Sequence, residues 1–238
     1  MTPEPRPTTA TAKSRCRLED YPKGARKLIL TAERLFGQYG IDNVSLRQIV
    51  SSAGQGNHYA VQHHFGSKEG LVNAIFNVRM AELDQERGKR LEALTARKKF
   101  AVRDVIVAIL MPIAEAMDER DRHLYVDFTM QVLHRNKLGR GGSLKDDIPV
   151  YETAAPNLVA LNALLKSFLP DMPLDIFNIR YRLAAEMFIS GVNELRRLNL
   201  VGRNPYGAEA QFWDDILGLT LAIFTAPIPP PPDTVKPQ

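Results

Sequence analysis

The chain has 238 residues, of which 45% are hydrophobic and 24% are charged, enough for a buried globular core. Its single cysteine, Cys16, excludes an internal disulfide and favours a reducing, cytoplasmic setting. No apolar stretch is long enough for a secretory signal or a membrane span. The net charge of +4 is uneven, because residues 1–68 hold ten Lys or Arg and five Asp or Glu, against 21 and 22 in the rest. This modest excess indicates a polyanionic partner for the N-terminal part.

The two ends of the chain are predicted to be disordered. Residues 1–21 form a basic arm rich in Pro and Thr, and residues 227–238 form a Pro-rich tail that cannot be helical. Between them, Val and Ile do not alternate with polar residues, so strands are not expected. The sequence therefore predicts an all-α protein.

The first predicted helix covers residues 23–39, where Leu28, Ala32, Leu35, Phe36 and Tyr39 share one face. The second helix, in SLRQIVSSA, begins at Ser45 and stops at Gly54. Ser45 and Gln48 have the spacing of a capping box, and Val44 and Ile49 have that of a hydrophobic staple.

The third predicted helix covers residues 57–64 with Asn57 as its cap, and Ser67 then caps a long helix over residues 67–94. Five more helices are expected after residue 100, and Pro112 should kink or break the first of them. Their predicted ranges are about 102–118, 119–137, 151–168, 173–199 and 206–225.

Three short helices with a tight turn at Ala53–Gly54 have the layout of a helix-turn-helix, whose second helix enters the major groove of DNA. On the third helix, one face is predicted to pack inward and the other to carry hydrogen-bonding side chains suited to bases or phosphates. The inward set is Ala60, Val61, His64 and Phe65. The outward set is His58, Tyr59, Gln62 and His63, with Gln55 and Asn57 at the helix start.

Three of the five histidines lie in residues 58–64, which raises the alternative of a metal site. Their spacing of i, i+5 and i+6 does not converge on one helix face, and no cysteine or nearby carboxylate completes a ligand set. A phosphate-binding loop is also excluded, because the G-Q-G stretch lacks a third glycine, a Lys-Ser/Thr pair and a preceding strand. No metal and no cofactor is therefore expected.

The motifs AERLFGQYG, SLRQIVSSAG and HFGSKEGL resemble the N-terminal domain of the TetR family of transcriptional regulators over about residues 25–76. The resemblance implies that Lys68 contacts a DNA phosphate, with Ser45 and Arg47 in the same role. Two departures stand out: the recognition-helix region has one extra residue, and the usual phosphate-binding tyrosine is missing near Phe65. Either Tyr59 or His63 is expected to replace it.

The same resemblance implies a C-terminal domain that binds a ligand and forms a homodimer. Residues 22–68 would then bind DNA, residues 69–226 would bind the effector and the second subunit, and the helix over 67–94 would connect the two. Predicted pocket residues are Met111, Phe128, Met130, Met187 and Phe188. Predicted dimer contacts are Leu183, Met187, Gly191, Leu195, Phe212, Ile216, Leu219 and Ile223.

The resulting prediction is a cytoplasmic, non-enzymatic repressor that binds a palindromic double-stranded operator as a homodimer and is released by a small hydrophobic effector. Two alternatives stay open, namely a constitutive DNA-binding protein without an effector and a helical enzyme acting on small molecules. No nucleophile–base pair has a meaningful spacing, so no catalytic residue is predicted.

Overall fold

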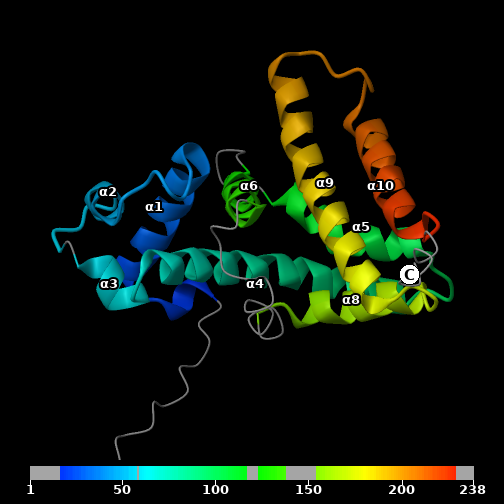
Figure 1. Cartoon of the computed structure of the whole chain (residues 1–238), viewed down its shortest axis with the longest axis horizontal. Coiled ribbons are helices and arrows are strands. Elements are labelled where there is room, and N and C mark those ends of the chain that lie inside the picture. Colours follow the sequence, from blue (N-terminus) through cyan, green and yellow to red (C-terminus); the bar gives the residue numbers. More distant parts are fainter. Residues whose placement is uncertain (1–16, 58, 117–122, 138–153, 229–238) are drawn as a thin grey trace, which may run out of the picture. The chain divides into compact units, whose positions relative to one another are not determined.

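The computed structural model describes residues 17–57, 59–116, 123–137 and 154–228. All regular elements in these ranges are helices, which confirms the predicted all-α fold (Figure 1). Within the same ranges, no helix has the length and apolarity needed to cross a membrane. Most of the predicted arm and tail lies outside the described residues. The α-helices are α1 (Lys23–Tyr39), α2 (Leu46–Ser52), α3 (Ala60–Phe65), α4 (Lys68–Thr95), α5 (Val102–Glu115), α6 (Leu124–Lys137), α8 (Pro156–Ser167), α9 (Leu174–Leu200) and α10 (Glu209–Thr225).

The chain divides into two compact units, each with its own core. The first unit comprises residues 1–89 and 116–159, and the second comprises residues 90–115 and 160–238. Helices α1, α2, α3 and α6 belong to the first unit, together with most of α4. Helices α5, α9 and α10 belong to the second, together with most of α8.

The core of the first unit forms around α1. Leu28, Ala32, Leu35 and Phe36 recur at three- and four-residue spacing and are all buried, as their periodicity predicts. Tyr39 was predicted on the same face but is 50% exposed, because α1 ends there and packing continues through other elements. Helices α2 and α3 both pack on α1.

Helix α6 crosses α1 at close range within the first unit. Phe36 of α1 stacks on Phe128 of α6 with ring centroids 6.4 Å apart, and both rings are fully buried. A Cβ atom at Gly37 would lie 3.0 Å from the Cβ of Asp127 and 3.3 Å from the backbone nitrogen of Phe128. The crossing therefore depends on the missing side chain at Gly37.

Buried charges tie α4 to its neighbours in the first unit. Arg79 of α4 donates two hydrogen bonds to Glu33 of α1, at 2.8 and 2.6 Å. Asp84 of α4 accepts the backbone N–H groups of Asn157 and Leu158 at the start of α8, at 3.0 and 2.8 Å. Because Glu33 and Asp84 are almost fully buried, these contacts satisfy carboxylates that would otherwise be costly.

The second unit is built on a hairpin of α9 and α10, which run side by side in Figure 1 and both pack on α5. Phe188 of α9 stacks on Trp213 of α10 with centroids 5.3 Å apart. Arg180 donates to the carbonyl oxygens of Phe224, Ala226 and Pro227 and so caps the end of α10, where free carbonyls favour a cation.

Pro112 does not break α5, which continues from Val102 to Glu115. Its neighbours Ile109 and Ile113 are buried, as is Pro112 itself. Packing of this apolar face thus outweighs the one backbone hydrogen bond that proline cannot make.

Candidate nucleic-acid interface

A side-chain cap fixes the start of α2. Ser45 Oγ accepts a hydrogen bond from the backbone N–H of Gln48 at 3.1 Å, which is one half of the predicted capping box. Val44 and Ile49 are buried on either side of this cap. The side chains of Ser45 and Arg47 are exposed, so both predicted phosphate contacts lie on the surface at this end of α2.

The turn after α2 is a Schellman motif. The backbone N–H of Gln55 donates to the carbonyl of Val50 at 3.1 Å, and that of Gly54 donates to Ser51 at 3.0 Å. Gly54 has φ +67°, and no atom would lie within 4 Å of an added Cβ. Glycine is favoured here by the left-handed backbone conformation rather than by lack of space.

Helix α3 starts later than the sequence suggested. Asn57 does not begin the helix, because its Oδ1 accepts from the backbone N–H of Tyr59 at 2.9 Å and its carbonyl accepts from Ala60 at 3.1 Å. These bonds form a turn, and α3 covers only Ala60–Phe65. Local propensity favours asparagine equally in a turn and in a cap, so the sequence could not separate the two.

Two buried residues orient α3. Ala60 and Val61 face the core, while Gln62 and His63 are exposed and the Tyr59 side chain is 75% exposed. His64 and Phe65 are half-buried, which agrees with their predicted inward placement, and the His64 ring contacts His63 at 4.7 Å. The predicted outward face is therefore present, except that His58 lies outside the described residues.

Gln55 takes part in the scaffold of this region. Its Nε2 donates to the carbonyl oxygen of Gly24 in α1 at 2.6 Å, and the side chain is half-buried. The amide thus joins the turn after α2 to the first turn of α1. Among the predicted contact residues, Asn57, Tyr59, Gln62 and His63 are exposed without such a tertiary contact in the bonds described.

Lys68 lies at the start of α4, where its Nζ is 5.8 Å from the ring centroid of Phe36 and 3.5 Å from the carbonyl oxygen of Asp42. Burial lowers the pKa of Lys68 below its ordinary value of 10.5, and the nearby charge of Arg135 acts in the same direction. The charges of Asp42 and Glu69 act in the opposite direction. A partly desolvated ammonium group held over a ring is favourably placed for an anion.

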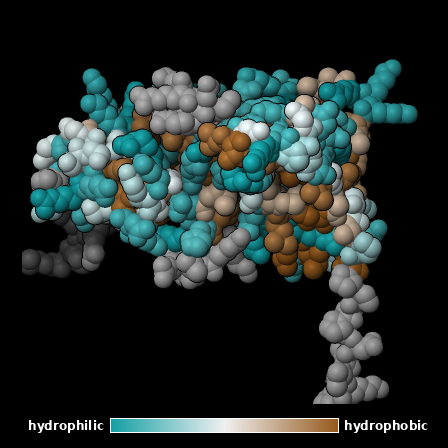
Figure 2. Space-filling model, turned by 90° about the horizontal axis from the view of Figure 1, so that it is seen from above, coloured by the Kyte–Doolittle hydropathy of each residue, from teal (hydrophilic) through white to brown (hydrophobic). Residues whose placement is uncertain are grey.

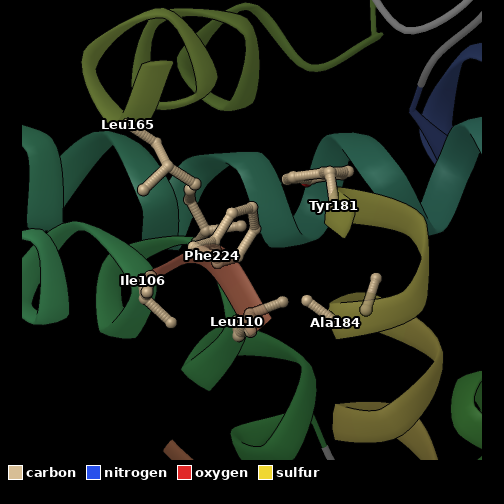
Figure 3. A pocket seen from close by; sticks show the side chains of 8 residues that line it. Ile106, Leu110, Leu165, Tyr181, Ala184 and Phe224 are labelled. Atoms are coloured by element: carbon tan, nitrogen blue, oxygen red, sulfur yellow. The ribbon is translucent and has the colours of Figure 1, made fainter. Parts of the chain in front are cut away.

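The second unit contains a small apolar pocket, seen from close by in Figure 3. Its free volume is about 10 Å³, roughly that needed for one water molecule. Drug-sized ligands occupy cavities of roughly 300–1,000 Å³, so this pocket would have to widen to take one. The lining side chains are Ile106, Ile109, Leu110, Leu165, Tyr181, Ala184, Ala185 and Phe224.

The five predicted pocket residues lie elsewhere. Phe128 is in the core of the first unit, and Phe188 is covered by Trp213 in the second. Met111, Met130 and Met187 are half-buried. Bulky apolar side chains at helical spacing do not reveal whether they fill a core or line a cavity, which is why the sequence did not identify this pocket.

The predicted dimer contacts differ in exposure. Leu183 and Leu219 are each 48% exposed, whereas Gly191, Leu195 and Phe212 are buried within the chain, and Met187, Ile216 and Ile223 are half-buried. In the second unit, on the right of Figure 2, hydrophobic side chains gather on the drawn surface. Only part of the two predicted stripes is therefore available to another subunit.

The described residues contain no cluster of His, Cys, Asp or Glu that could hold a metal ion. Several contacts had no sequence signal, among them the pairs of Arg79 with Glu33 and of Arg135 with Glu69. Their members are 46 and 66 residues apart, and no motif relates them.

Three comparisons with known proteins bear on this chain. Residues 28–75 match the family model described as bacterial regulatory proteins, tetR family. No curated protein matches the chain. Among solved structures, a Mesorhizobium loti protein assigned to the TetR family of transcriptional regulators is similar, with 18% identity and a TM-score of 0.44 over 84% of this chain and 95% of that one.

The matched segment covers α1, α2, α3 and the first residues of α4. It contains the capped second helix, the glycine turn and the exposed face of α3 described above. Through this N-terminal domain, the chain is a member of the TetR family of bacterial transcriptional regulators, and α1 to α3 form its DNA-binding helix-turn-helix.

Proposed function

We propose that this regulator is a repressor that binds a near-palindromic double-stranded operator as a homodimer and is released by a small apolar effector. The observation that carries the DNA-binding part is the exposed polar face at the start of α3, centred on Tyr59. Its geometry suits the end of a recognition helix that contacts bases in the major groove. We place the protein in the cytoplasm and assign it no enzymatic activity.

We assign the predicted contacts to two roles. Asn57, Tyr59, Gln62 and His63 read base edges or the adjoining backbone, together with His58. Ser45, Arg47 and Lys68 bind phosphates, which position the protein without reading sequence. Gln55 supports the readers through its bond to Gly24. Tyr59 replaces the family's missing phosphate-binding tyrosine, since it is the more exposed and longer of the two candidates.

The homodimer follows from exposed apolar side chains on the α9–α10 hairpin. Leu183 and Leu219 are large and half-exposed, and Ile179 on α9 is 44% exposed. Burying such side chains against a second copy would remove apolar surface from water. A two-fold dimer would then present two recognition helices about 34–36 Å apart, which matches one turn of DNA.

The effector part of the proposal is carried by the wholly apolar lining of the pocket in Figure 3. Hydrocarbon side chains from α5, α8, α9 and α10 favour an uncharged, apolar ligand. Such a ligand would bind a widened form of this pocket and shift the population toward a form with low DNA affinity. Typical coupling of about 1–3 kcal/mol lowers affinity roughly 5–150-fold.

A constitutive DNA-binding protein is the second candidate, favoured by the small volume of the pocket. Footprinting on the DNA next to the protein's own gene, with and without apolar ligands, separates the two. Protection that a ligand abolishes supports the repressor. Protection that survives every ligand shown to bind the second unit supports the constitutive protein.

Substitution of Tyr59 tests the reading face directly. Tyr59→Ala should weaken operator binding and change sequence preference, by about 1–3 kcal/mol for each lost base contact. Tyr39→Ala is the matched control, since Tyr39 is an exposed tyrosine of the same unit outside α3. Equal operator affinity and preference for both variants would contradict the assignment of Tyr59.

A further inference from the structure

Arg135 of α6 holds two carboxylates that come from different parts of the helix-turn-helix region. Its Nη2 donates to Oε1 of Glu69 at 2.9 Å, and its Nε lies 3.1 Å from Oδ1 of Asp42. The Arg135 side chain is only 18% exposed, so the guanidinium is held in place rather than free in solvent. Its bond lowers the pKa of Glu69 below the ordinary value, since it favours the ionised carboxylate.

Both carboxylates adjoin the predicted phosphate contact Lys68. Asp42 lies in the turn between α1 and α2, and its backbone carbonyl is 3.5 Å from the ammonium of Lys68. Glu69 follows Lys68 in the first turn of α4. Arg135 therefore contacts the residues on both sides of this lysine, although it belongs to α6, well outside the segment that matches the family model.

The charges explain why this contact bears on DNA binding. Asp42 and Glu69 are 46% and 59% exposed, so their carboxylates lie at the surface next to Lys68. Unpaired, they would attract the ammonium of Lys68 and repel an approaching phosphate. The guanidinium of Arg135 compensates both negative charges and leaves the lysine available.

We propose that Arg135 is a positioning residue of the DNA-binding surface, which neutralises Asp42 and Glu69 and thereby directs Lys68 to a DNA phosphate. The inference rests on the proposed DNA binding through Lys68. It extends the functional surface to α6, and it gives a helix outside the helix-turn-helix a defined electrostatic part in operator affinity.

The test measures operator affinity of full-length variants at several salt concentrations. Arg135→Gln should weaken binding about threefold to tenfold, in line with the loss of two partly exposed ion pairs. It should also reduce the salt dependence by about one phosphate contact, as Lys68→Ala does. Arg135→Lys should recover part of the affinity, because an ammonium group can still pair with one carboxylate.

Arg90→Gln is the matched control. Arg90 forms an ion pair with Glu115 at 2.6 Å in the second unit and is 31% exposed, so the variant removes the same charge and a similar contact far along the chain. It should leave affinity and salt dependence near those of the wild type. Equal effects of Arg135→Gln and Arg90→Gln would overturn the proposal.

A second background keeps the test independent of folding. In Asp42→Asn/Glu69→Gln protein the carboxylates are gone, so adding Arg135→Gln should cost no further affinity. An undiminished cost in that background would also overturn the proposal. Absence of salt-dependent DNA binding by the wild type would instead refute the proposed function itself.

Discussion

Glu33 provides a sharp test of what holds α1 against α4. Its carboxylate is 1% exposed and accepts two hydrogen bonds from Arg79, whose side chain is 24% exposed. The same guanidinium donates to Glu82, which is 46% exposed, at 2.7 Å. Hydrogen bonds and charge from Glu33 raise the pKa of Arg79 despite its burial, so the guanidinium stays ionised.

Replacing Glu33 with glutamine removes the buried charge but keeps one acceptor. Breaking a buried ion pair typically costs about 3–5 kcal/mol. The remaining acceptor and the surviving contact with Glu82 reduce the expected loss to about 2–3 kcal/mol in the free energy of unfolding. Glu82→Gln removes a carboxylate from the same guanidinium at the surface and should cost at most about 0.5 kcal/mol.

Thermal and urea unfolding should be followed by far-UV circular dichroism and by fluorescence of Trp213, the single tryptophan, which reports on the second unit. Glu33→Gln should lower the melting temperature of the circular dichroism transition by about 5–10 °C, and Glu82→Gln by less than about 2 °C. If the two variants shift the transition equally, the burial argument for the Glu33–Arg79 pair is refuted.

Three further outcomes are expected. Gly37→Ala should destabilise the protein by about 1–3 kcal/mol in urea unfolding, because its Cβ would press on α6, whereas Gly218→Ala, with open space around it, should be neutral or slightly stabilising. The stability that Glu69 contributes should be present above its ordinary pKa of 4.5 and lost as pH falls through its lowered folded-state pKa, and Glu69→Gln should abolish this part of the acid dependence. Leu183→Glu should shift the protein from dimer to monomer in light scattering, while Leu174→Glu, on an exposed position of the same helix, should not.

The helices of the N-terminal region were largely predictable because their signals are local. The apolar period of α1 and the cap at Ser45 are both read within a few residues, and both are found in the structure. The start of α3 was placed too early, since Asn57 suits a turn as well as a cap. Helix ends after residue 100 were likewise approximate, and α10 begins at Glu209 rather than near residue 206.

The contacts between distant segments could not be predicted from one sequence. Arg135 meets Glu69 only because α6 packs on α1, and no local pattern in either segment indicates that packing. The same holds for Arg180, whose predicted alternatives were an anionic ligand or an acidic neighbour, but which binds backbone carbonyls at the end of α10. The exposed face of α3 was predictable, because burial follows directly from helical period.

The cap that Asp84 provides has a consequence for how this chain folds. Helix α8 begins at Pro156, and its first free N–H groups are satisfied by a carboxylate 73 residues earlier in the chain. The end of α8 is therefore stabilised only after that long loop has closed, which costs chain entropy and slows assembly. Formation of α8 should follow that of α4, and variants of Asp84 should accelerate unfolding more than they slow folding.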